Sequence, residues 1–394
     1  MVIILLKFPK YAYNCINVLL NNGFEAYFVG GCVRDGLLSR PCYDIDITTN
    51  ALPDEIMALF PTAIPTGIAH GTITVMQEGY PIEITTYRKE EGYRDNRHPD
   101  NVSFVSSLDE DLSRRDFTFN ALACSKDGEI ADLFGGINDL NNKLIRTVGE
   151  AEKRFEEDAL RILRAYRFAA TLGFEIECNT KSATLKLANN INNISGERIL
   201  TELVKTANGI KPSVIFELLN TGALTNFGIE AGNENVAPVN KIHTLNLNDI
   251  QKASLFFTCI NHNLENIKSQ LKACNVLLQN INALDEMREH KIPNDKYDLK
   301  QLLYKYGIDT VNLYLNYLAL CSYENSEFLF NILNEIINNK EAFKISDLAI
   351  SGNDIMELGF SGAEVGQQLY KALLYVMKDN NKNQKEDILN HLHQ

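Results

Sequence analysis

The sequence predicts an α+β fold, in which an N-terminal part mixes strands with helices and the rest of the chain is wholly helical. Two patterns carry this prediction. Before about residue 150, polar and apolar residues alternate in short runs, which is typical of half-buried strands. After it, apolar residues recur at the spacing of amphipathic helices. The length of 394 residues agrees with two or three globular domains.

The N-terminal part contains a helix, several strands and a polar loop. The predicted helix covers 11–20, the strands cover 25–29, 43–48, 71–77 and 81–87, and the loop covers 92–101. Gly23 ends the helix, because glycine adopts the left-handed conformation that closes helices at little cost. The last two strands flank Glu78-Gly79-Tyr80, which predicts a hairpin.

The helical remainder is divided by turn residues. Helices are predicted over 157–172, 180–188, 197–207, 212–219, 264–279, 299–306 and 327–337. A further helix is predicted to begin at Ala363, after Gly359 and Gly362. Its N-terminus would be either a phosphate-binding site or an ordinary helix-turn-helix packing corner. We expect four consecutive domains: a head over 1–148, a neck over 149–208, a body over 209–270 and a tail over 271–394.

Charge and thiols restrict the class of protein. The formal net charge of −13 argues against a DNA-packaging protein and, by itself, against any nucleic-acid partner. The eight cysteines form no CxxC pair and no zinc-finger spacing with histidine, so reduced thiols and a cytoplasmic location are expected. No stretch approaches the roughly 18 apolar residues of a membrane span, so no membrane partner is predicted.

The pair Asp44 and Asp46 predicts a metal site. Residues i and i+2 of a strand project to the same face, so both carboxylates would point the same way. Mg²⁺ prefers hard oxygen ligands and takes one or two protein carboxylates together with substrate phosphates. We therefore expect one or two Mg²⁺ ions at this catalytic pair, although two solvated acids on a strand face are the commoner explanation of such a motif.

The residues before the acid pair favour the metal site. Gly30-Gly31 follow a predicted strand and let the backbone approach a triphosphate, and Arg34 would neutralise its charge. A strand, a glycine pair, Arg34-Asp35, a loop and a strand with two acids together describe a nucleotidyltransferase head of the polymerase β kind, a mixed sheet with helices.

Ordered motifs then indicate the family. The first is VGGCVRDGLLSRPCYDIDITTNA (29–51), followed by PTGIAHGTITV (65–75), IEITTYRKEEGYRDNRHPDNVSF (82–104), RRDFTFNALA (114–123), DLFGG (132–136) and RFEEDALRILRAYRFAATLGFEIE (154–177). SGERILTEL (195–203) and ISGNDIMELGFSGAEVGQQL (350–369) fit more faintly. The chain resembles class II tRNA nucleotidyltransferases, or CCA-adding enzymes, and bacterial poly(A) polymerases. The resemblance implies a polymerase-β-like head followed by a helical neck, body and tail.

Asp158 and Arg161 are predicted to read the nucleotide base. Both lie on the predicted helix over 157–172, and the i,i+3 spacing gives them one face. Asp158 accepts and Arg161 donates, which matches the amine and ring nitrogen of cytosine or adenine. Uracil and guanine would leave a buried acceptor unpaired, at a cost of about 1–3 kcal/mol. The resemblance implies this role for the motif EDxxR (157–161). It therefore implies CTP and ATP as substrates.

The remaining site residues are predominantly arginines. Arg164 and Arg167 continue the stripe of Arg161 by threes, and triphosphate oxygens are their expected partners, with a solubilising helix surface as the alternative. The resemblance implies that Gly31 and Arg34, together with Arg115 and Asp116, contact the sugar and phosphates. For Glu83, a structural role is favoured over that of a third metal-binding carboxylate.

The predicted activity is addition or repair of the 3′-terminal CCA of tRNA, whose acceptor and TΨC arm the helical part would bind. The alternatives are a poly(A) polymerase, an enzyme that adds only CC or only A, and a non-catalytic RNA-binding protein. Family members that add only CC generally have a shorter loop than the residues 91–100 found here, so we expect full CCA addition. The sequence leaves the oligomeric state open, with a homodimer as one option.

Overall fold

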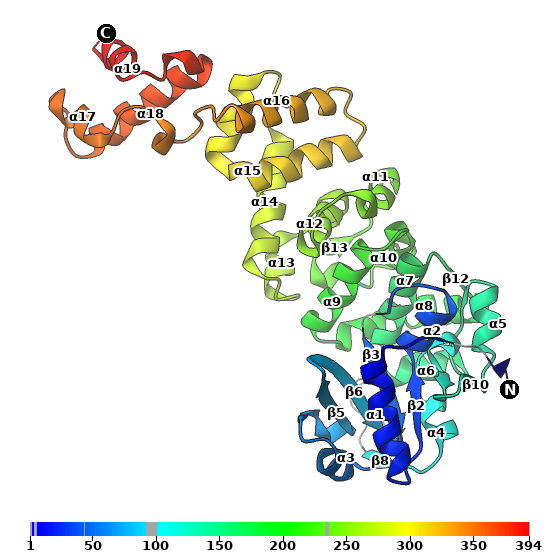
Figure 1. The fold of residues 1–394 in the computed structure, drawn as a ribbon. Helices are drawn as coiled ribbons and strands as arrows, with labels where there is room; N and C mark the ends of the chain where they lie inside the picture. The colour runs from blue at the N-terminus through cyan, green and yellow to red at the C-terminus, as the bar shows by residue number, and fades with distance from the viewer. Residues whose placement is uncertain (1, 4–5, 43, 92–100, 233–235, 394) are drawn as a thin grey trace. The chain divides into compact units, whose positions relative to one another are not determined.

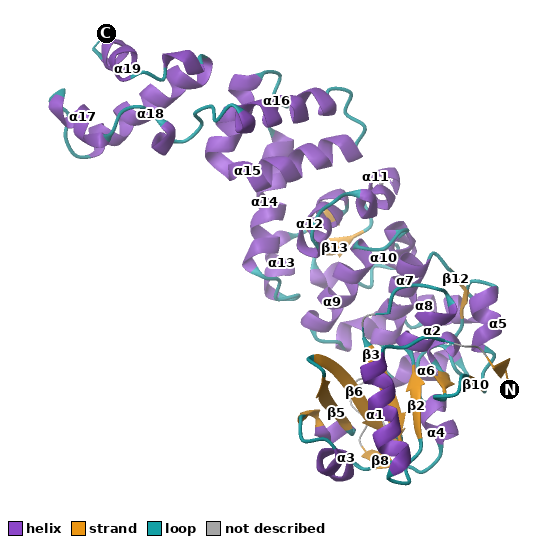
Figure 2. Ribbon diagram, viewed as in Figure 1, coloured by secondary structure: helices purple, strands orange, loops and turns teal. Residues whose placement is uncertain are grey.

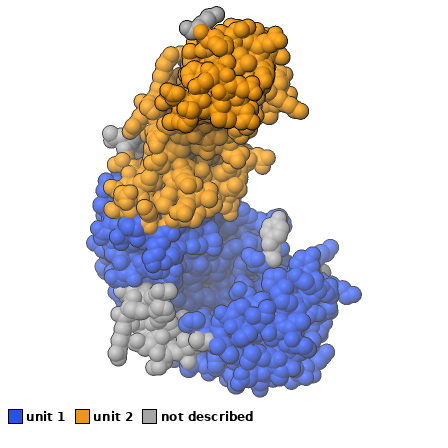
Figure 3. Space-filling view, turned by 90° about the vertical axis from the view of Figure 1, so that its left-hand side faces the viewer, with its two compact units in different colours: residues 1–231, 269–272 blue, residues 232–268, 273–394 orange. Residues whose placement is uncertain are grey.

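The computed structural model describes residues 2–3, 6–42, 44–91, 101–232 and 236–393, coloured along the chain in Figure 1. The chain forms two compact units (Figure 3). Unit 1 comprises residues 1–231 and 269–272, and unit 2 comprises residues 232–268 and 273–394. Residues 92–100 of the predicted loop lie outside the described residues, so that prediction is not tested.

Unit 1 begins with a mixed sheet that helices cover (Figure 2). Its strands are β1 (Val2–Ile3), β2 (Ala26–Val29), β3 (Ile45–Thr49), β4 (Ala63–Gly67), β5 (Thr72–Gln77), β6 (Tyr80–Thr86), β9 (Leu122–Cys124) and β10 (Glu129–Asp132). The order across the sheet is β1-β10-β9-β2-β3-β6-β5-β4. Only β3 and β6 pair in parallel among these described strands. The predicted hairpin is confirmed, since β5 and β6 pair antiparallel across Glu78 and Gly79, which both have positive φ.

Alternating side chains of the central strands build the core of the sheet. Phe28, Ile47 and Ile84 are fully buried, and Ile16 and Leu19 of α1 pack into the same apolar cluster. The helices beside the sheet are α1 (Lys10–Asn21), α2 (Gly31–Leu37), α3 (Pro53–Leu59), α4 (Leu108–Ser113) and α5 (Gly136–Asn141). The short β7 (Arg88–Glu91) and β8 (Asn101–Phe104) form a separate ribbon.

The helical part of unit 1 corrects one prediction. It contains α6 (Ala151–Glu157), α7 (Leu160–Leu172), α8 (Cys178–Lys186), α9 (Gly196–Ala207) and α10 (Phe216–Leu219), with the short β11 (Leu144–Ile145), β12 (Glu175–Ile176) and β13 (Ile229–Glu230). The predicted helix over 157–172 is wrong at its start. Glu157 is the last residue of α6, the helical conformation is interrupted there, and α7 begins only at Leu160. Asp158 sits in this break with extended backbone, φ −140° and ψ 103°. Its carboxylate accepts a hydrogen bond from the Leu160 amide, a local bond that competes with helix continuation.

Unit 2 contains α11 (Val236–Lys241), α12 (Asp249–Cys259), β14 (Asn261–His262), α13 (Leu264–Ser269), α14 (Asn275–Glu289), α15 (Lys296–Leu320), α16 (Ser326–Asn338), α17 (Gly352–Glu357), α18 (Ala363–Lys378) and α19 (Lys385–Leu392), although the last residue of α13 belongs to unit 1. A single helix over 264–279 is wrong, because residues 269–272 return to unit 1 and Lys272 has a positive φ. The helix predicted to begin at Ala363 is confirmed.

The predicted fold class is confirmed: a polymerase-β-like head with a mixed sheet precedes a helical remainder. The division of that remainder into neck, body and tail stays a prediction. None of the helices in the described ranges has the length and apolar character that crossing a bilayer requires.

Candidate active site

Nine of the ten predicted site residues line one pocket of unit 1, with a volume of about 510 Å³. They are Gly31, Arg34, Asp46, Arg115, Asp116, Asp158, Arg161, Arg164 and Arg167. Asp44 is not part of the lining. Eight arginines line the pocket against three aspartates, so its surface is strongly cationic. Such a surface suits the several negative charges of a nucleoside triphosphate.

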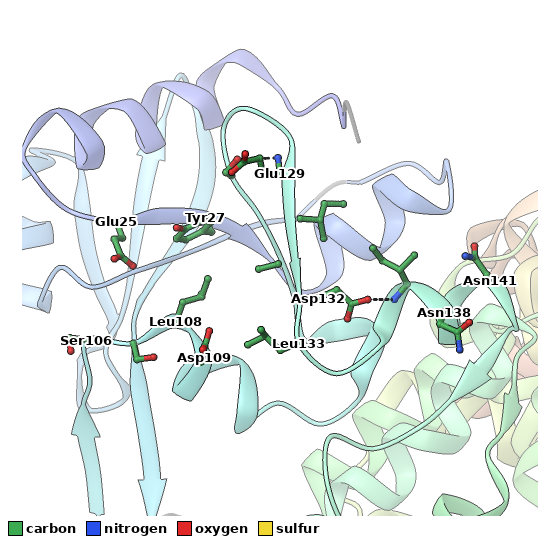
Figure 4. A pocket seen from close by; sticks show the side chains of 15 residues that line it. Glu25, Tyr27, Ser106, Leu108, Asp109, Glu129, Asp132, Leu133, Asn138 and Asn141 are labelled. Atoms are coloured by element: carbon green, nitrogen blue, oxygen red, sulfur yellow. Dashed lines mark hydrogen bonds between the residues drawn. The ribbon is translucent and has the colours of Figure 1, made fainter. Parts of the chain in front are cut away.

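A larger pocket, of about 1030 Å³, lies elsewhere on unit 1 and contains none of the predicted residues (Figure 4). Its charged lining residues are Glu25, Asp109, Glu129 and Asp132, and no lysine or arginine is among the described residues of its wall. This acidic wall would repel a triphosphate. Because charge decides between them, the smaller cationic pocket is the candidate site.

The acid pair lies at the start of β3. Asp46 is half-buried within the strand, and Asp44 is exposed one residue before it. The predicted strand included Tyr43, which lies outside the described residues. Glu83 of β6 lies directly opposite Asp46 in the parallel register, so three carboxylates gather at this end of the sheet.

The surroundings of Asp46 fit a bound cation. Burial, followed by the charges of Glu83 and Asp44, raises the pKa of Asp46 to about 6, while Arg115 and Arg34 act in the opposite direction. A divalent cation would relieve this repulsion, and carboxylate oxygens are the ligands that Mg²⁺ prefers. Across the described part of the chain, however, no three Asp, Glu, His or Cys side chains are grouped closely enough to hold a metal ion alone. The residues therefore fit a Mg²⁺ that takes its remaining ligands from substrate phosphates and water.

The glycine pair places backbone and Arg34 at the pocket. Gly30 has φ +72° and a β-carbon there would lie 3.2 Å from Arg115 Nη1, so a side chain at this position is strained and crowded. Arg34 extends from α2 and donates to both carboxylate oxygens of Asp35, at 2.9 and 2.7 Å. Its Nη1 donates to Asn120 Oδ1 at 2.9 Å. These bonds fix the guanidinium in the wall.

Arg115 and Asp116 lie side by side in sequence but have different surroundings. Arg115 donates to the fully buried Asp111 at 3.2 Å, and its buried Nε has no hydrogen-bond partner among the described residues. Asp116 accepts from Arg164 Nε at 2.7 Å, from the Phe117 amide at 2.8 Å and from Asn120 at 3.2 Å. Burial alone would raise the pKa of Asp116, but the charge and hydrogen bonds of Arg164, with the Asn120 amide, lower it to about 2.

Asp158 and Arg161 meet at the pocket without sharing a helix, which corrects the predicted geometry. Asp158 accepts from Arg198 Nη2 at 2.9 Å. Arg161 is 7% exposed and donates to Glu157, at 2.7 Å, and to the carbonyls of Arg154 and Arg114. Those bonds use three of its five N–H groups. The remaining donors of Arg161 and the unused lone pairs of Asp158 are the groups available to a base.

Arg164 and Arg167 are paired with carboxylates, whereas the sequence predicts triphosphate partners. Arg164 binds Asp116, and Arg167 Nε donates to Glu202 Oε2 of α9 at 2.8 Å. Phe168 is the aromatic centre of this cluster, since the guanidiniums of Arg167, Arg164 and Arg34 lie 3.6, 5.5 and 5.2 Å from its ring centroid. Cation–π attraction and carboxylate pairing together hold three positive groups close to one another.

Sequence reasoning missed several residues of the lining, namely Arg88, Arg114, Asn120, Leu160, Phe168 and Arg198. Asn120 and Arg114 lie inside the motif RRDFTFNALA, and Arg198 lies inside SGERILTEL. Polar side chains inside these motifs could have indicated that Asn120, Arg114 and Arg198 belong to the site. Glu202 is 4% exposed, and a buried acid on a helix also predicts a cationic partner.

Family models cover most of the chain. The poly A polymerase head domain matches residues 26–146, the probable RNA and SrmB-binding site of polymerase A matches 173–227, and tRNA nucleotidyltransferase domain 2 matches 231–392. The three matches follow one another along the sequence in the order head, middle and C-terminal part.

Relatives agree with these models. The CCA-adding enzyme of Leuconostoc citreum is 56% identical over 187 residues, which span 48% of this chain and about half (46%) of that enzyme. The CCA-adding enzyme of Anoxybacillus flavithermus is 36% identical over 385 residues, covering 95% of this chain and 94% of the relative. The crystal structure of the Bacillus stearothermophilus CCA-adding enzyme in complex with CTP superposes with a TM-score of 0.80 at 31% identity, covering 98% and 96% of the two chains. The chain therefore belongs to the family of CCA-adding enzymes, the tRNA nucleotidyltransferases that its ordered motifs predict.

Proposed function

We propose that the protein adds or repairs the 3′-terminal CCA of tRNA, using CTP and ATP and releasing pyrophosphate. The observation that carries the proposal is the pocket in which eight arginines, Arg161 among them, meet Asp46 and Asp158. Its charge suits a triphosphate, and its acids suit a cation and a base edge. The CTP-bound structure of the relative from Bacillus stearothermophilus supports the choice of nucleotide.

In this mechanism, the terminal ribose hydroxyl of the RNA attacks the α-phosphorus of the bound nucleotide. A new P–O bond forms, and the bond to the β-phosphate breaks as pyrophosphate leaves. Asp44 and Asp46 would hold Mg²⁺, which supplies activation of the hydroxyl and stabilisation of the leaving pyrophosphate when bound. We propose that Glu83, which faces Asp46 across the β3–β6 register, acts on Asp46 through its charge.

Arginines bind and orient the triphosphate. Arg34, Arg115, Arg164 and Arg167 are held by carboxylates or Phe168, so their donors stay in place before the substrate arrives. A fixed donor loses little entropy on binding, which improves both affinity and alignment for an in-line reaction. We propose that Asp116 acts mainly through Arg164, since three described donors already occupy its carboxylate.

Asp158 and Arg161 select the base. Asp158 offers an acceptor to the exocyclic amine of cytosine or adenine, and Arg161 offers a donor to the ring nitrogen. The hydrogen bond from Arg198 orients the Asp158 carboxylate, and the hydrogen bond to Glu157 orients the Arg161 guanidinium. We propose that the neck, body and tail, over 149–208, 209–270 and 271–394, bind the acceptor and TΨC arm of tRNA. We place the reaction in the cytoplasm, as the scattered thiols predict.

Nucleotide incorporation tests the proposal. We expect a tRNA that ends before CCA to receive two C residues and one A, and a tRNA that ends in CC to receive A alone. Incorporation of CTP only would indicate a CC-adding enzyme, and incorporation of ATP only into the CC-ended tRNA would indicate an A-adding enzyme. Failure with every tRNA and both nucleotides would contradict the proposal.

The acid assignment has its own test. We expect Asp46→Asn to lower incorporation of both CTP and ATP by more than about a hundredfold, since it removes a ligand to the proposed cation. Asp109→Asn is the matched control, because Asp109 lines the larger acidic pocket. Equal activities of the two variants would refute the role of Asp46.

A further inference from the structure

A buried carboxylate lies behind the lining of the cationic pocket. Asp111 of α4 is fully buried and is not itself part of the lining. Withdrawing a carboxylate from water is costly unless charged or polar partners compensate its charge. The partners of Asp111 therefore show which groups this buried charge holds in place.

Two neighbouring arginines of the pocket wall donate to Asp111. Arg114 donates from Nε and Nη2 to Oδ1, at 3.0 and 2.8 Å. Arg115 donates from Nη2 to Oδ2 at 3.2 Å. Burial alone would raise the pKa of the Asp111 carboxyl, but the charges and hydrogen bonds of Arg115 and Arg114 lower it. The ionised carboxylate thus fixes both guanidiniums.

The same carboxylate contacts the strand that carries the acid pair. Thr48 Oγ1 lies 3.1 Å from Asp111 Oδ2 and 3.3 Å from the carbonyl oxygen of Thr85. Thr48 is fully buried and follows Asp46 by two residues on β3, so their side chains project to the same face of the sheet. A single oxygen of Asp111 therefore connects Arg115 with the strand of Asp46.

Arg115 in turn borders Asp46. A β-carbon at Gly30 would lie 3.2 Å from Arg115 Nη1 and 3.8 Å from Asp46 Oδ2, so both groups flank this glycine. Burial raises the pKa of Asp46 to about 6, and the charge of Arg115 opposes that rise. Nη2 of Arg115 is engaged by Asp111, whereas its buried Nε has no hydrogen-bond partner among the described residues. This geometry directs a donor of Arg115 to a phosphate beside the acid pair.

We infer that Asp111 is a positioning residue for nucleotidyl transfer, which holds Arg115 beside the acid pair by binding its guanidinium and Thr48 through one oxygen. The inference rests on the proposed function. Because Asp111 is buried outside the lining, its effect on the reaction passes through Arg115. A guanidinium that is fixed before the substrate binds places its charge where the transition state needs it, and a misplacement of about 1 Å can cost about a hundredfold in rate.

The variant Asp111→Asn separates the two arginines. Arg114 donates twice to Oδ1, so we expect the amide oxygen to occupy that position. The amide nitrogen then replaces Oδ2 and faces Arg115 Nη2, a donor opposite a donor. Arg115 is released while Arg114 stays paired. We expect kcat to fall by about 10- to 100-fold for both CTP and ATP, with a smaller change in KM, because alignment is lost and attraction to the charge is not.

The matched control is Asp139→Asn. Asp139 is 2% exposed and binds the same kinds of partner, Arg146 Nε at 3.2 Å and the Thr118 hydroxyl at 2.7 Å. These three residues are not part of the pocket lining. Thermal melts measure the stability that each variant loses. We expect both variants to be destabilised and only Asp111→Asn to lose kcat.

A double-mutant cycle tests whether Asp111 acts through Arg115. In the Arg115→Ala background, adding Asp111→Asn should lower kcat by less than about twofold further, since the connection is already broken. Additive losses, or equal kcat values for Asp111→Asn and Asp139→Asn, would overturn the inference. If Asp111→Asn does not fold, Thr48→Val removes the contact to the strand alone. A fall in kcat of at least about threefold then supports the inference, and an unchanged kcat overturns it.

The wild-type protein distinguishes the two levels of the argument. If it incorporates neither CTP nor ATP, the proposed function fails and the role of Asp111 fails with it. If it incorporates both nucleotides and Asp111→Asn retains the wild-type kcat, the proposed function stands and the role of Asp111 alone is refuted.

Discussion

Asp116 illustrates how one residue connects charge, folding and binding in this pocket. It is 9% exposed, yet it is held ionised by Arg164 and by two further donors. A buried carboxylate is tolerated only when its charge is compensated, so Asp116 and Arg164 stabilise each other. The same pair holds Arg164 where a triphosphate would bind.

We expect this pair to make stability depend on pH in the acid range. The pKa of Asp116 is about 2 in the folded protein, below the usual value of about 3.9 for an unfolded chain. The contribution is therefore present above pH ~4 and is lost as the pH falls toward about 2, with a size of roughly 2 kcal/mol. Denaturant unfolding of wild type and Asp116→Asn at several pH values measures it. A stability gap that stays constant between pH 5 and 2 would contradict the expectation.

Arg198 is expected to act as a positioning residue for base selection. Its Nη2 binds Asp158 at 2.9 Å, and its buried Nη1 has no hydrogen-bond partner within the described chain. Without Arg198, the Asp158 carboxylate loses a donor that sets its orientation. We expect Arg198→Ala to reduce discrimination against UTP and GTP by about tenfold, the equivalent of about 1.4 kcal/mol.

The measurement is the ratio of kcat/KM for CTP and UTP. Arg198→Lys should recover part of the selectivity, because it restores one donor to Asp158. Arg146→Ala is the matched control, since Arg146 pairs with Asp139 outside this pocket. A loss of kcat/KM that is equal for both nucleotides would indicate that Arg198 is merely structural.

At the scale of elements, α6, α7 and α9 form the end of the pocket that we propose recognises the base. The break between α6 and α7 exposes Asp158, and α9 supplies Arg198 and Glu202. Gly196 lies at the start of α9, where a β-carbon would collide with the backbone of Gln270 and Leu271. Only glycine permits this close approach of two backbones.

We expect Gly196→Ala to destabilise unit 1 by more than about 1 kcal/mol, because neither backbone can yield easily. Denaturant unfolding measures the change. Gly366→Ala is the matched control: Gly366 lies within α18, and its added β-carbon would meet no atom within 4 Å. The control should be neutral or slightly stabilising, since alanine is the better helix former. Two equal stabilities would show that the contact at Gly196 relaxes freely.

Much of the fold was predictable from local patterns, and the errors have local causes. Strand alternation located β2, β3, β5 and β6, and helical periodicity located α9 within a residue. Periodicity alone did not reveal the break at Asp158, because a side-chain bond to the Leu160 amide produces it. The β3–β6 register, which brings Glu83 to Asp46, depends on the tertiary fold. Motifs predicted nine of the sixteen pocket residues, whereas the carboxylate partners of the arginines required the structure.

For the whole molecule, the distribution of charge matters more than its sum. The net charge is −13, but eight arginines gather in one pocket. The RNA binding that we propose would therefore depend on where the cations lie and not on the net charge of the protein. Such binding releases counterions from the phosphates and weakens as salt rises.

We expect the affinity for tRNA to fall by at least about tenfold between about 50 and about 200 mM salt. Fluorescence anisotropy with a labelled tRNA measures it, and log K should fall linearly with log salt concentration. The control is the thermal unfolding midpoint over the same series, which verifies that the protein stays folded. An affinity independent of salt would contradict a binding surface built on arginine–phosphate contacts.

The return of residues 269–272 to unit 1 has a consequence for biosynthesis. The ribosome completes the catalytic sheet early, but the backbone that covers the start of α9 emerges more than 70 residues after Gly196. A nascent chain that ends at residue 231 would lack this cover, and Arg198 and Glu202 would sit on an incompletely packed helix. The nucleotide pocket is therefore finished late in translation, after the first segment of unit 2 has already been made.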